Sequence, residues 1–294
     1  MGKSPTISIV VVNYNTSDLL SGALESIVST VGDLHVDIVV IDNASTDGGF
    51  SRLDKKFERD PRFSFVQNQK NIGLTAMNIM LERTKGKYIV TLDPDARLHA
   101  NALQLLVAFL ETTPQAGAVT ANLLNTNGSM QRYIRRLMTP TLCFFTTIIG
   151  RAIDKYLLGL HHYKWYHYDD VSLAQITEIE QPSVTCLMFR REVCGPYIVD
   201  PDTLFYFTDV GLCKCIYNHD YKIYLVPEAT ATHLKSTSFK KANNTWRERE
   251  YYRSLFVYLK KHYPASAPVM AVVLWLDRVM RAFLEHTIGH VPMR

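Results

Sequence analysis

The first third of the chain alternates between two kinds of hydrophobic pattern. Continuous apolar runs, typical of parallel strands buried on both faces, cover residues 7–12, 36–41 and 88–92. Apolar residues at helical spacing predict helices over residues 18–30, 71–84 and 101–111, and a short strand is predicted at 63–66. This alternation predicts an α/β chain with a doubly wound, Rossmann-like sheet.

The pattern is looser after residue 120, where strands are predicted at 183–189 and 223–226 and helices at 246–262 and 268–288. The segment 139–160 is apolar and aromatic, but Arg151, Asp154 and Lys155 interrupt it, so it is not expected to span a bilayer. The last helix begins with eight apolar residues, and its charged residues then fall on one face: Asp277, Arg278, Arg281 and Glu285. Such a helix suits a surface or a partner, and membrane contact and plain core packing both stay open.

Composition narrows the class of protein only a little. With 294 residues, 47% hydrophobic and 20% charged, the chain has an ordinary globular profile, and a net charge of +4 does not indicate a nucleic-acid partner. Clusters of Lys and Arg late in the chain fit phosphates, an anionic membrane or simply a solvated surface. Five scattered cysteines and no secretory signal predict a cytoplasmic protein.

Polar residues follow the predicted strands at the edge where open α/β sheets bind their ligands. Asp93 and Asp95 end the strand at 88–92, and residues two apart in extended backbone point the same way. Two carboxylates there suit Mg²⁺ or Mn²⁺. Asp42 ends the second strand, where it can accept a hydrogen bond from a nucleotide; turn and cap chemistry explains Asp42 and Asp47 equally.

Two later residues are candidates for chemistry. Asp209 directly follows the aromatic residues 205–207, so it can sit in a partly desolvated pocket and accept a proton from a hydroxyl group. It can also be the N-cap of a helix predicted at 210–218. His233 follows an apolar strand, where it is either a metal ligand or a structural residue.

Seven segments, in order, resemble family 2 of the inverting glycosyltransferases, which have the GT-A fold, and in particular its bacterial rhamnosyltransferase-like members. The matching segments are SIVVVNYNT at 8–16, VIDNASTDG at 40–48, NIGLTAMN at 71–78, TLDPDA at 91–96, TCLMFRRE at 185–192, FYFTDVGLCKCIYNHDYKIYLVPEATATH at 205–233 and YYRSLFVYLKKHYP at 251–264. The resemblance covers nearly the whole chain to residue 264.

This resemblance implies a role for each matching residue. Asp209 would be the catalytic base, and Asp93, Asp95 and His233 would hold Mg²⁺ or Mn²⁺ on the donor diphosphate. Donor-binding roles fall on Asn13, Tyr14, Asn15, Asp42, Asn71, Asp93 and Arg253. The donor would be a dTDP- or UDP-sugar, with rhamnose favoured by the subgroup, and the acceptor a glycan or lipid-linked glycan in cell-surface polysaccharide synthesis.

The resemblance also implies an organisation of the chain. Residues 1–240 would form the GT-A catalytic domain, with a nucleotide-sugar half at 1–120 and an acceptor half at 121–240. Residues 241–294 would be C-terminal helices that meet a membrane or a second subunit. The enzyme would then be cytoplasmic, peripheral on the inner face of the cell membrane or free of it.

Several residues depart from the family pattern. Thr208 replaces a usual Glu, Gly211 an Asp, Asp93 an Asn and Met77 a Gly, and residues 235–237 replace a glycine-rich stretch. These changes put the donor and acceptor in doubt, and they leave open a catalytically silent, membrane-associated carbohydrate-binding or scaffold protein. A Rossmann dehydrogenase is disfavoured, because the turn after the first strand lacks the glycine-rich phosphate motif.

Overall fold

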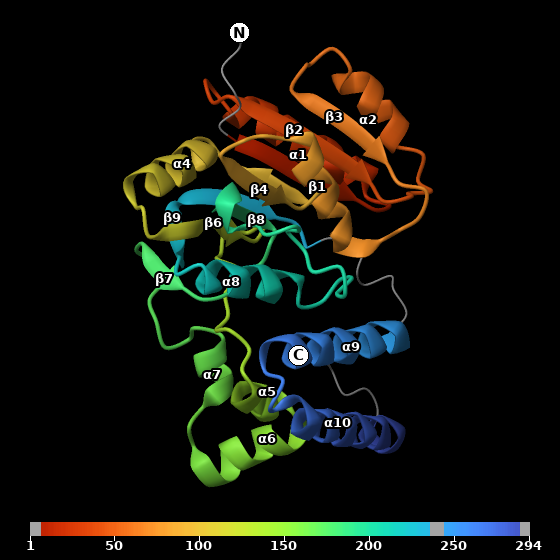
Figure 1. The fold of residues 1–294 in the computed structure, drawn as a ribbon, viewed down its shortest axis with the longest axis vertical. Helices are drawn as coiled ribbons and strands as arrows, with labels where there is room; N and C mark the ends of the chain where they lie inside the picture. The colour runs from red at the N-terminus through yellow and green to blue at the C-terminus, as the bar shows by residue number, and fades with distance from the viewer. Residues whose placement is uncertain (1–6, 236–243, 289–294) are drawn as a thin grey trace.

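A computed structural model describes residues 7–235 and 244–288, and one mixed β-sheet organises most of them (Figure 1). The strand order is β3-β2-β1-β4-β8-β6-β9-β5, and β7 also pairs with β9. The first four strands are parallel: Ile7–Asn13 (β1), Val36–Asp42 (β2), Phe63–Gln67 (β3) and Tyr88–Leu92 (β4). The remaining strands are Ala96–Leu98 (β5), Ala116–Leu124 (β6), Thr177–Ile179 (β7), Cys186–Arg190 (β8) and Lys222–His233 (β9).

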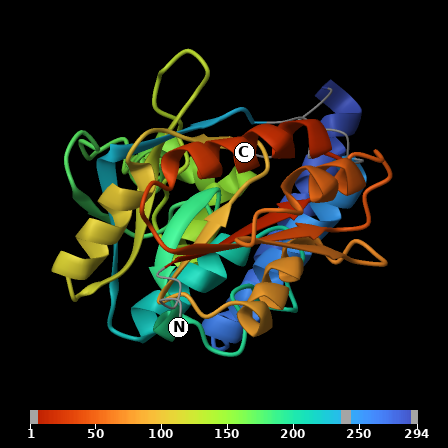
Figure 2. The same cartoon turned by 90° about the horizontal axis from the view of Figure 1, so that it is seen from above.

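Helices cover the sheet where apolar residues recur at helical spacing. They are Ser17–Thr30 (α1), Phe50–Phe57 (α2), Ile79–Arg83 (α3), Ala102–Thr112 (α4) and Thr208–Asn218 (α8), with short 3₁₀ turns at Gly73–Asn78 (η1) and Arg191–Val193 (η3). Viewed from above, α4 and α2 lie at opposite ends of the sheet (Figure 2). The α/β prediction is confirmed.

The helix predicted at 71–84 is wrong in its first half. Gly73 has a left-handed φ of 64°, and the Asn71 side chain accepts a hydrogen bond from its N–H at 2.8 Å. A Cβ at Gly73 would lie 2.4 Å from the Leu204 carbonyl oxygen, so the close approach of that loop requires glycine. The turn stays in 3₁₀ geometry until α3 begins at Ile79.

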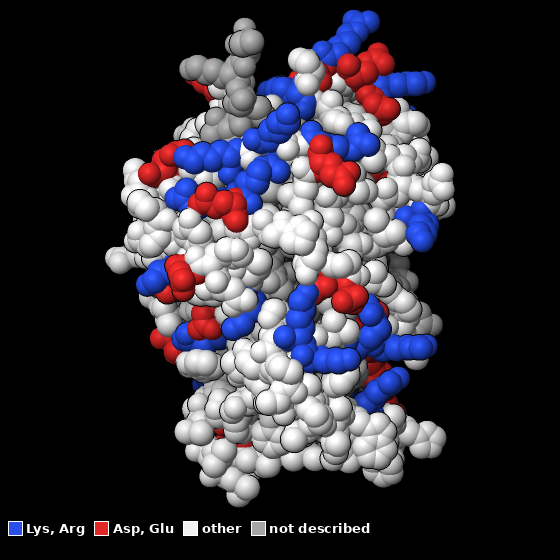
Figure 3. All heavy atoms as spheres, viewed as in Figure 1, with Lys and Arg blue, Asp and Glu red and all other residues white. Residues whose placement is uncertain are grey.

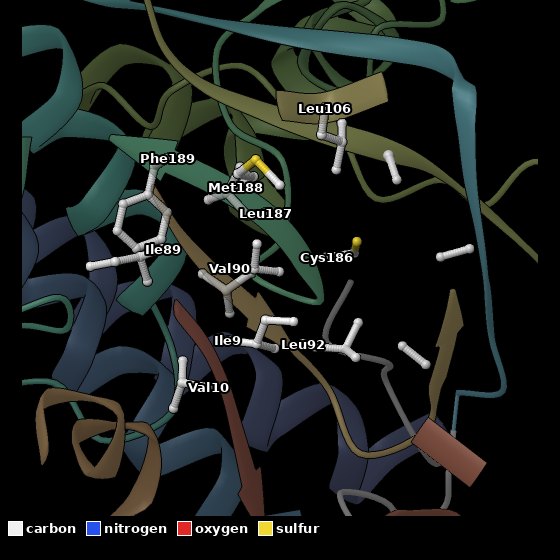
Figure 4. Close-up of a cluster of buried hydrophobic side chains, with 14 of the residues drawn as sticks. Ile9, Val10, Ile89, Val90, Leu92, Leu106, Cys186, Leu187, Met188 and Phe189 are labelled. Carbon is white, nitrogen blue, oxygen red and sulfur yellow. The ribbon is translucent and has the colours of Figure 1, made fainter. Parts of the chain in front are cut away.

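The main core lies where the parallel and antiparallel parts of the sheet meet. Side chains of β1, β4 and β8, among them Ile9, Val90 and Met188, pack together in the interior and are fully buried (Figure 4). They come from continuous apolar runs because both faces of these strands are covered.

A second layer of helices lies below the sheet in Figure 1. It contains Pro140–Thr146 (α5), Ile148–Ile153 (α6), a π-helical turn at Asp154–Leu158 (η2), His162–Tyr166 (α7), Asn244–His262 (α9) and Ala267–Ile288 (α10). Its separate apolar core includes Leu142, Leu255 and Leu274. Helices α5–α7 thus pack with the C-terminal helices, and the predicted boundary at residue 240 lies outside the described residues.

Two predictions about this layer can be compared with the structure. Within the described residues no helix combines the length and apolar character of a membrane span. The charged residues of α10 fall on one side of the helix, as predicted, but they differ in exposure: Asp277 and Arg281 are buried and form an ion pair at 2.9 Å inside the layer, whereas Arg278 is exposed.

Candidate active site

The loops after β1 and β2 are joined by buried hydrogen bonds. Asn13, at the end of β1, donates to Asp42 Oδ1 at 2.8 Å and to Ser45 Oγ at 3.0 Å. The second carboxylate oxygen of Asp42 accepts the Ser45 N–H at 3.0 Å. Asn13 and Asp42 are both fully buried, so they hold the shape of this edge of the sheet. Turn chemistry therefore accounts for Asp42 here, and its contact with a nucleotide stays a prediction.

More exposed residues complete the rim of this network. Asn15, with a φ of 54°, accepts the Thr46 N–H at 2.7 Å, while Tyr14 beside it is 44% exposed. Asn43 donates to Asn71 Oδ1 at 2.8 Å, which brings in the segment after β3. Three strand-end loops thus form one polar surface, as the carboxyl edge of a parallel sheet should.

Asp47 has a structural role. Its carboxylate accepts hydrogen bonds from the N–H and Oγ of Ser17 and from the Gly49 N–H, at 2.9–3.1 Å. Burial opposes ionisation, but these hydrogen bonds lower the pKa of Asp47 below its usual value. It therefore caps α1 from another loop, which matches the cap alternative.

Asp93, Asp95 and His233 meet at one point beside these loops. The antiparallel pairing of β5 with β9 sets Ala96 opposite His233, which places His233 Nε2 3.4 Å from Asp95 Oδ1. One ligand atom from each of the three residues lies within 4.8 Å of the other two. This spacing and the two carboxylates plus one imidazole form a candidate site for a divalent metal ion.

The side chain of Gln131 orients His233. Its amide nitrogen donates to the carbonyl oxygens of His233 at 2.6 Å and Leu124 at 3.2 Å, so its Oε1 is the atom that faces His233 Nδ1 at 3.0 Å. An amide oxygen only accepts, so Nδ1 carries a proton, and Nε2 is the nitrogen that faces the carboxylates and is available to a metal ion in the neutral imidazole. Metal-binding histidines commonly have such a partner.

The carboxylates of Asp93 and Asp95 lie close together, where Asp95 is buried and Asp93 is partly buried. Burial and the charge of Asp95 raise the pKa of Asp93 above its usual value, and the charge of Asp209 adds to this effect. Burial disfavours protonation of His233, but its contact with Asp95 and the charges of both carboxylates raise its pKa. Adjacent acids that repel each other are the electrostatic condition that a bound cation relieves.

Asp209 lies in the first turn of α8 and is not its N-cap. The N-cap is Phe207, in left-handed conformation with a φ of 62°, so the N-cap alternative is wrong. Asp209 Oδ2 accepts the amide of Gln181 at 3.0 Å, and Oδ1 accepts the Val210 N–H at 2.9 Å. The carboxylate is thus held in one orientation by two donors.

A cleft of about 430 Å³ opens at Asp209. Its walls carry aromatic side chains and two arginines, and its lining also includes Val184, next to the Thr185 hydroxyl that donates to Asp93 at 2.8 Å. The aromatic and basic lining residues are Tyr166, Phe205, Tyr206, Phe207, Tyr251, Arg135 and Arg247. The cleft therefore adjoins the Asp93–Asp95–His233 cluster through the segment 184–185.

Arg253 does not line this cleft. It forms an ion pair with Glu250 at 2.8 Å and donates to the carbonyl oxygen of Asp202 at 3.0 Å. Its donor-binding role stays a prediction. Sequence reasoning missed Gln131, Gln181 and Thr185: a lone glutamine or threonine carries no spacing signal, and only the fold brings these residues to His233, Asp209 and Asp93.

The fold of the chain is that of the GT-A type, which it shares with solved structures. The chain superimposes on a mannosyltransferase from Pyrobaculum calidifontis, solved with GDP-Man and Mn²⁺, with a TM-score of 0.56 and 19% identity over 99% of this chain and 78% of that one. It also superimposes on S. aureus TarS, solved with UDP-GlcNAc, with a TM-score of 0.57 and 15% identity over 86% of this chain and 65% of that one. These likenesses show the GT-A fold.

The sequence places the chain within a family. Residues 8–194 match glycosyl transferase family 2, so the chain belongs to this family. It is 29% identical over 112 residues to an uncharacterized glycosyltransferase of Haemophilus influenzae, covering 38% of this chain and 34% of that protein. It is 33% identical over 103 residues to an Escherichia coli chondroitin synthase, covering 34% of this chain and 15% of the synthase. The chain thus spans about a third of the first relative and much less of the second.

Proposed function

We propose that the chain transfers a sugar from a nucleoside diphosphate sugar to an acceptor hydroxyl, with inversion at the anomeric carbon and with Asp209 as the base. The observation that carries the proposal is the position of Asp209, which lies at the cleft and close enough to the Asp93–Asp95–His233 cluster to influence the pKa of Asp93. A base and a diphosphate site are the two parts that such a displacement needs.

The step is a single displacement. The acceptor hydroxyl passes its proton to Asp209 while its oxygen forms a bond to the anomeric carbon. The bond from that carbon to the diphosphate oxygen breaks, and the nucleoside diphosphate leaves with the electron pair. Gln181 keeps the carboxylate turned towards the cleft throughout. No covalent sugar–protein intermediate is needed, so one carboxylate at the cleft suffices.

Asp93, Asp95 and His233 would hold the metal ion, and their arrangement fits one. When bound, the ion neutralises charge on the departing diphosphate. Mg²⁺ takes oxygen ligands, whereas the set here includes an imidazole nitrogen held in the ligating tautomer, so Mn²⁺ is the ion we expect. The mannosyltransferase of the same fold was solved with Mn²⁺, which supports this choice.

The substrates follow from the cleft and the relatives. Aromatic walls suit sugar rings, and Arg135 and Arg247 suit the phosphate of a lipid-linked glycan. The E. coli relative is a chondroitin synthase, which favours a role in polysaccharide synthesis. Rhamnose as the donor sugar rests on the subgroup resemblance. The donor would be either a dTDP-sugar or a UDP-sugar.

The loops with Asn13–Asn15, Asp42 and Asn71 would receive the nucleotide. Residues 1–240 would be the catalytic domain and 241–294 the helices that meet a membrane or second subunit, and the protein would act on the cytoplasmic side of the membrane.

A donor screen with matched variants tests the proposal. Thermal stability would be measured with dTDP-rhamnose, UDP-glucose, UDP-galactose, UDP-N-acetylglucosamine and GDP-mannose, in Mn²⁺, Mg²⁺ or EDTA, followed by transfer assays with the donor that stabilises. Asp95→Asn should lose metal-dependent stabilisation, while Asp209→Asn should keep it and lose transfer. Asp220→Asn, an exposed acid just beyond the other end of α8, is the control and should change neither.

Each outcome bears on a different part of the proposal. Transfer by Asp209→Asn at the wild-type rate removes this residue as the base, and a product with retained anomeric configuration, determined by NMR, removes the inverting step. Metal-dependent stabilisation that survives in Asp95→Asn removes the ligand assignment. Stabilisation by a donor without any transfer or hydrolysis favours the silent carbohydrate-binding protein.

A further inference from the structure

The last helix, α10, turns charged residues inward. Asp277 is 4% exposed and accepts hydrogen bonds from the Tyr252 hydroxyl at 2.6 Å, from Arg281 Nε at 2.9 Å and from the Ile148 N–H at 2.7 Å. The ion pair between Asp277 and Arg281 lies on the same side of α10 as the buried Met270. The contacts connect α10 with α6 and α9 and fix the rotation of the helix about its axis.

The opposite side of α10 carries an exposed apolar stripe. Its six residues are each between 42% and 66% exposed and fall within an arc of about 120° on a helical wheel: Val269, Val272, Trp275, Leu276, Val279 and Phe283. Six exposed apolar side chains side by side on one helix are unfavourable in water, so this stripe indicates an apolar partner on the outer face.

A second exposed apolar group lies on a neighbouring element. The end of η2 and the residues after it are between 48% and 78% exposed: Tyr156, Leu157, Leu158 and Leu160. Helix α6 leads directly into η2 and also contacts α10, and the three form the lowest layer of the molecule in Figure 1. Figure 3 shows few charged side chains on this lower part of the molecule. We call the two groups together the apolar base.

We propose that the apolar base binds the surface of an anionic lipid bilayer. Its side chains protrude, with five of them more than 60% exposed, and a fluid bilayer accepts protruding groups without the complementary shape that a protein interface requires. Trp275, Phe283 and Tyr156 are aromatic residues of the kind that enter the membrane interface.

The charges beside the apolar base favour an anionic surface. On α6, η2, α7 and α10, the exposed charged side chains of described residues are Lys155, Lys164, Arg278 and Glu285. Three cations against one anion attract anionic headgroups. The buried Asp277–Arg281 pair contributes no net charge to this balance.

This contact would bring the cleft to a membrane-bound acceptor, a consequence that rests on the proposed function. The cleft is lined in part by Thr146 of α5, Tyr166 of α7 and Tyr251 of α9, so it opens within the same layer of helices whose lower surface is the apolar base. The lipid contact itself needs neither donor nor metal, so it can be tested separately from transfer.

The test is co-sedimentation with vesicles of phosphatidylcholine alone or of an equimolar mixture with phosphatidylglycerol. Two variants remove apolar groups from the two parts of the base, Trp275→Ser with Phe283→Ser, and Leu157→Ser with Leu160→Ser. The matched control, Val171→Ser with Ile176→Ser, removes two exposed apolar residues elsewhere. Circular dichroism and the melting temperature establish that each variant is folded.

We expect the wild type and the control to bind the anionic vesicles, less tightly as salt increases, and each base variant to bind at least about tenfold more weakly. Equal binding by the folded base variants overturns the proposal, as does a wild type that stays in solution with both kinds of vesicle. Sedimentation equilibrium without lipid tests whether a second copy of the chain covers the apolar base instead. A wild-type dimer that the base variants convert to monomers, without vesicle binding, would assign the surface to a second copy instead.

Discussion

Replacing Gln131 with methionine should weaken metal binding although Gln131 is not a ligand. The side chain is 3% exposed and makes three hydrogen bonds, two from its amide to carbonyl oxygens and one accepted from His233 Nδ1. Methionine has nearly the same length and volume, so it fills the space and removes all three. His233 then loses the contact that fixes its tautomer and its ring orientation.

The expected magnitude follows from these contacts. Loss of a hydrogen-bond partner to a metal-binding histidine commonly lowers metal affinity by about 10- to 100-fold, or about 1.4–2.7 kcal/mol. Three lost hydrogen bonds at about 1 kcal/mol each should also lower the free energy of unfolding of the metal-free protein by about 3 kcal/mol. The two effects must be separated, because a less stable protein also binds metal less well when it unfolds.

Gln104 provides the matched control. Its amide donates to the carbonyl oxygens of Thr30 at 2.8 Å and Val31 at 3.2 Å, the same pattern as Gln131, but on α4 and without a contact to the cluster. Gln104→Met should therefore lose stability, about 2 kcal/mol, without losing metal affinity.

Mn²⁺ binding would be measured by the electron paramagnetic resonance signal of the free ion, well below the melting temperature and with UDP present. A Gln131→Met variant that is folded and binds Mn²⁺ with the wild-type affinity would refute the orienting role. Reduced affinity in both variants would show that general loss of stability, and not the tautomer of His233, explains the effect.

Three further predictions concern the cleft and the helical layer. Gln181→Leu should lower kcat and shift its pH profile, with Mn²⁺ affinity unchanged, because Gln181 holds Asp209; an unchanged profile would contradict this role. Burial and nearby arginines lower the pKa of His167 to about 4. Between about pH 6.5 and about pH 4 the unfolded chain therefore binds a proton that the folded chain does not, so the free energy of unfolding should decrease as the pH is lowered through this range. Urea unfolding of His167→Gln should show a smaller loss over that range, and an equal loss would assign the effect elsewhere. Asp277→Ala removes the carboxylate from the buried Asp277–Arg281 ion pair and should cost about 3–5 kcal/mol in thermal or urea unfolding, whereas a loss under 1 kcal/mol would contradict the inward orientation of α10.

The sequence by itself determined the elements that depend on local pattern. The strands at β1, β2 and β4 lie within a residue of the apolar runs that predict them, because a strand buried on both faces must be apolar throughout. Asp93 and Asp95 could be singled out because they follow a buried strand at the edge where such sheets bind ligands. The extended backbone expected for them is not observed: residues 94–95 form a turn in which the Ala96 N–H donates to the Asp93 carbonyl oxygen at 3.0 Å, so a turn and not the spacing of a strand brings the two carboxylates together.

Only the tertiary structure decided which distant residues share the site. His233 reaches Asp95 through the pairing of β5 with β9, and Gln131 reaches His233 across 102 positions of sequence. Neither contact leaves a periodic signal, because each depends on strand register. The first half of the segment 71–84 has helical spacing, yet Gly73 and the Leu204 loop hold it in a 3₁₀ turn.

The orientation of α10 shows the same division. Its apolar and charged faces can be predicted from the sequence, because helical periodicity is local. Which of the two faces turns inward depends on partners elsewhere in the chain, here Tyr252 and the N–H of Ile148, which satisfy Asp277 inside the protein. Periodicity therefore defines the faces of a helix, while the free energy of satisfying or burying each face in its surroundings decides which one meets the solvent.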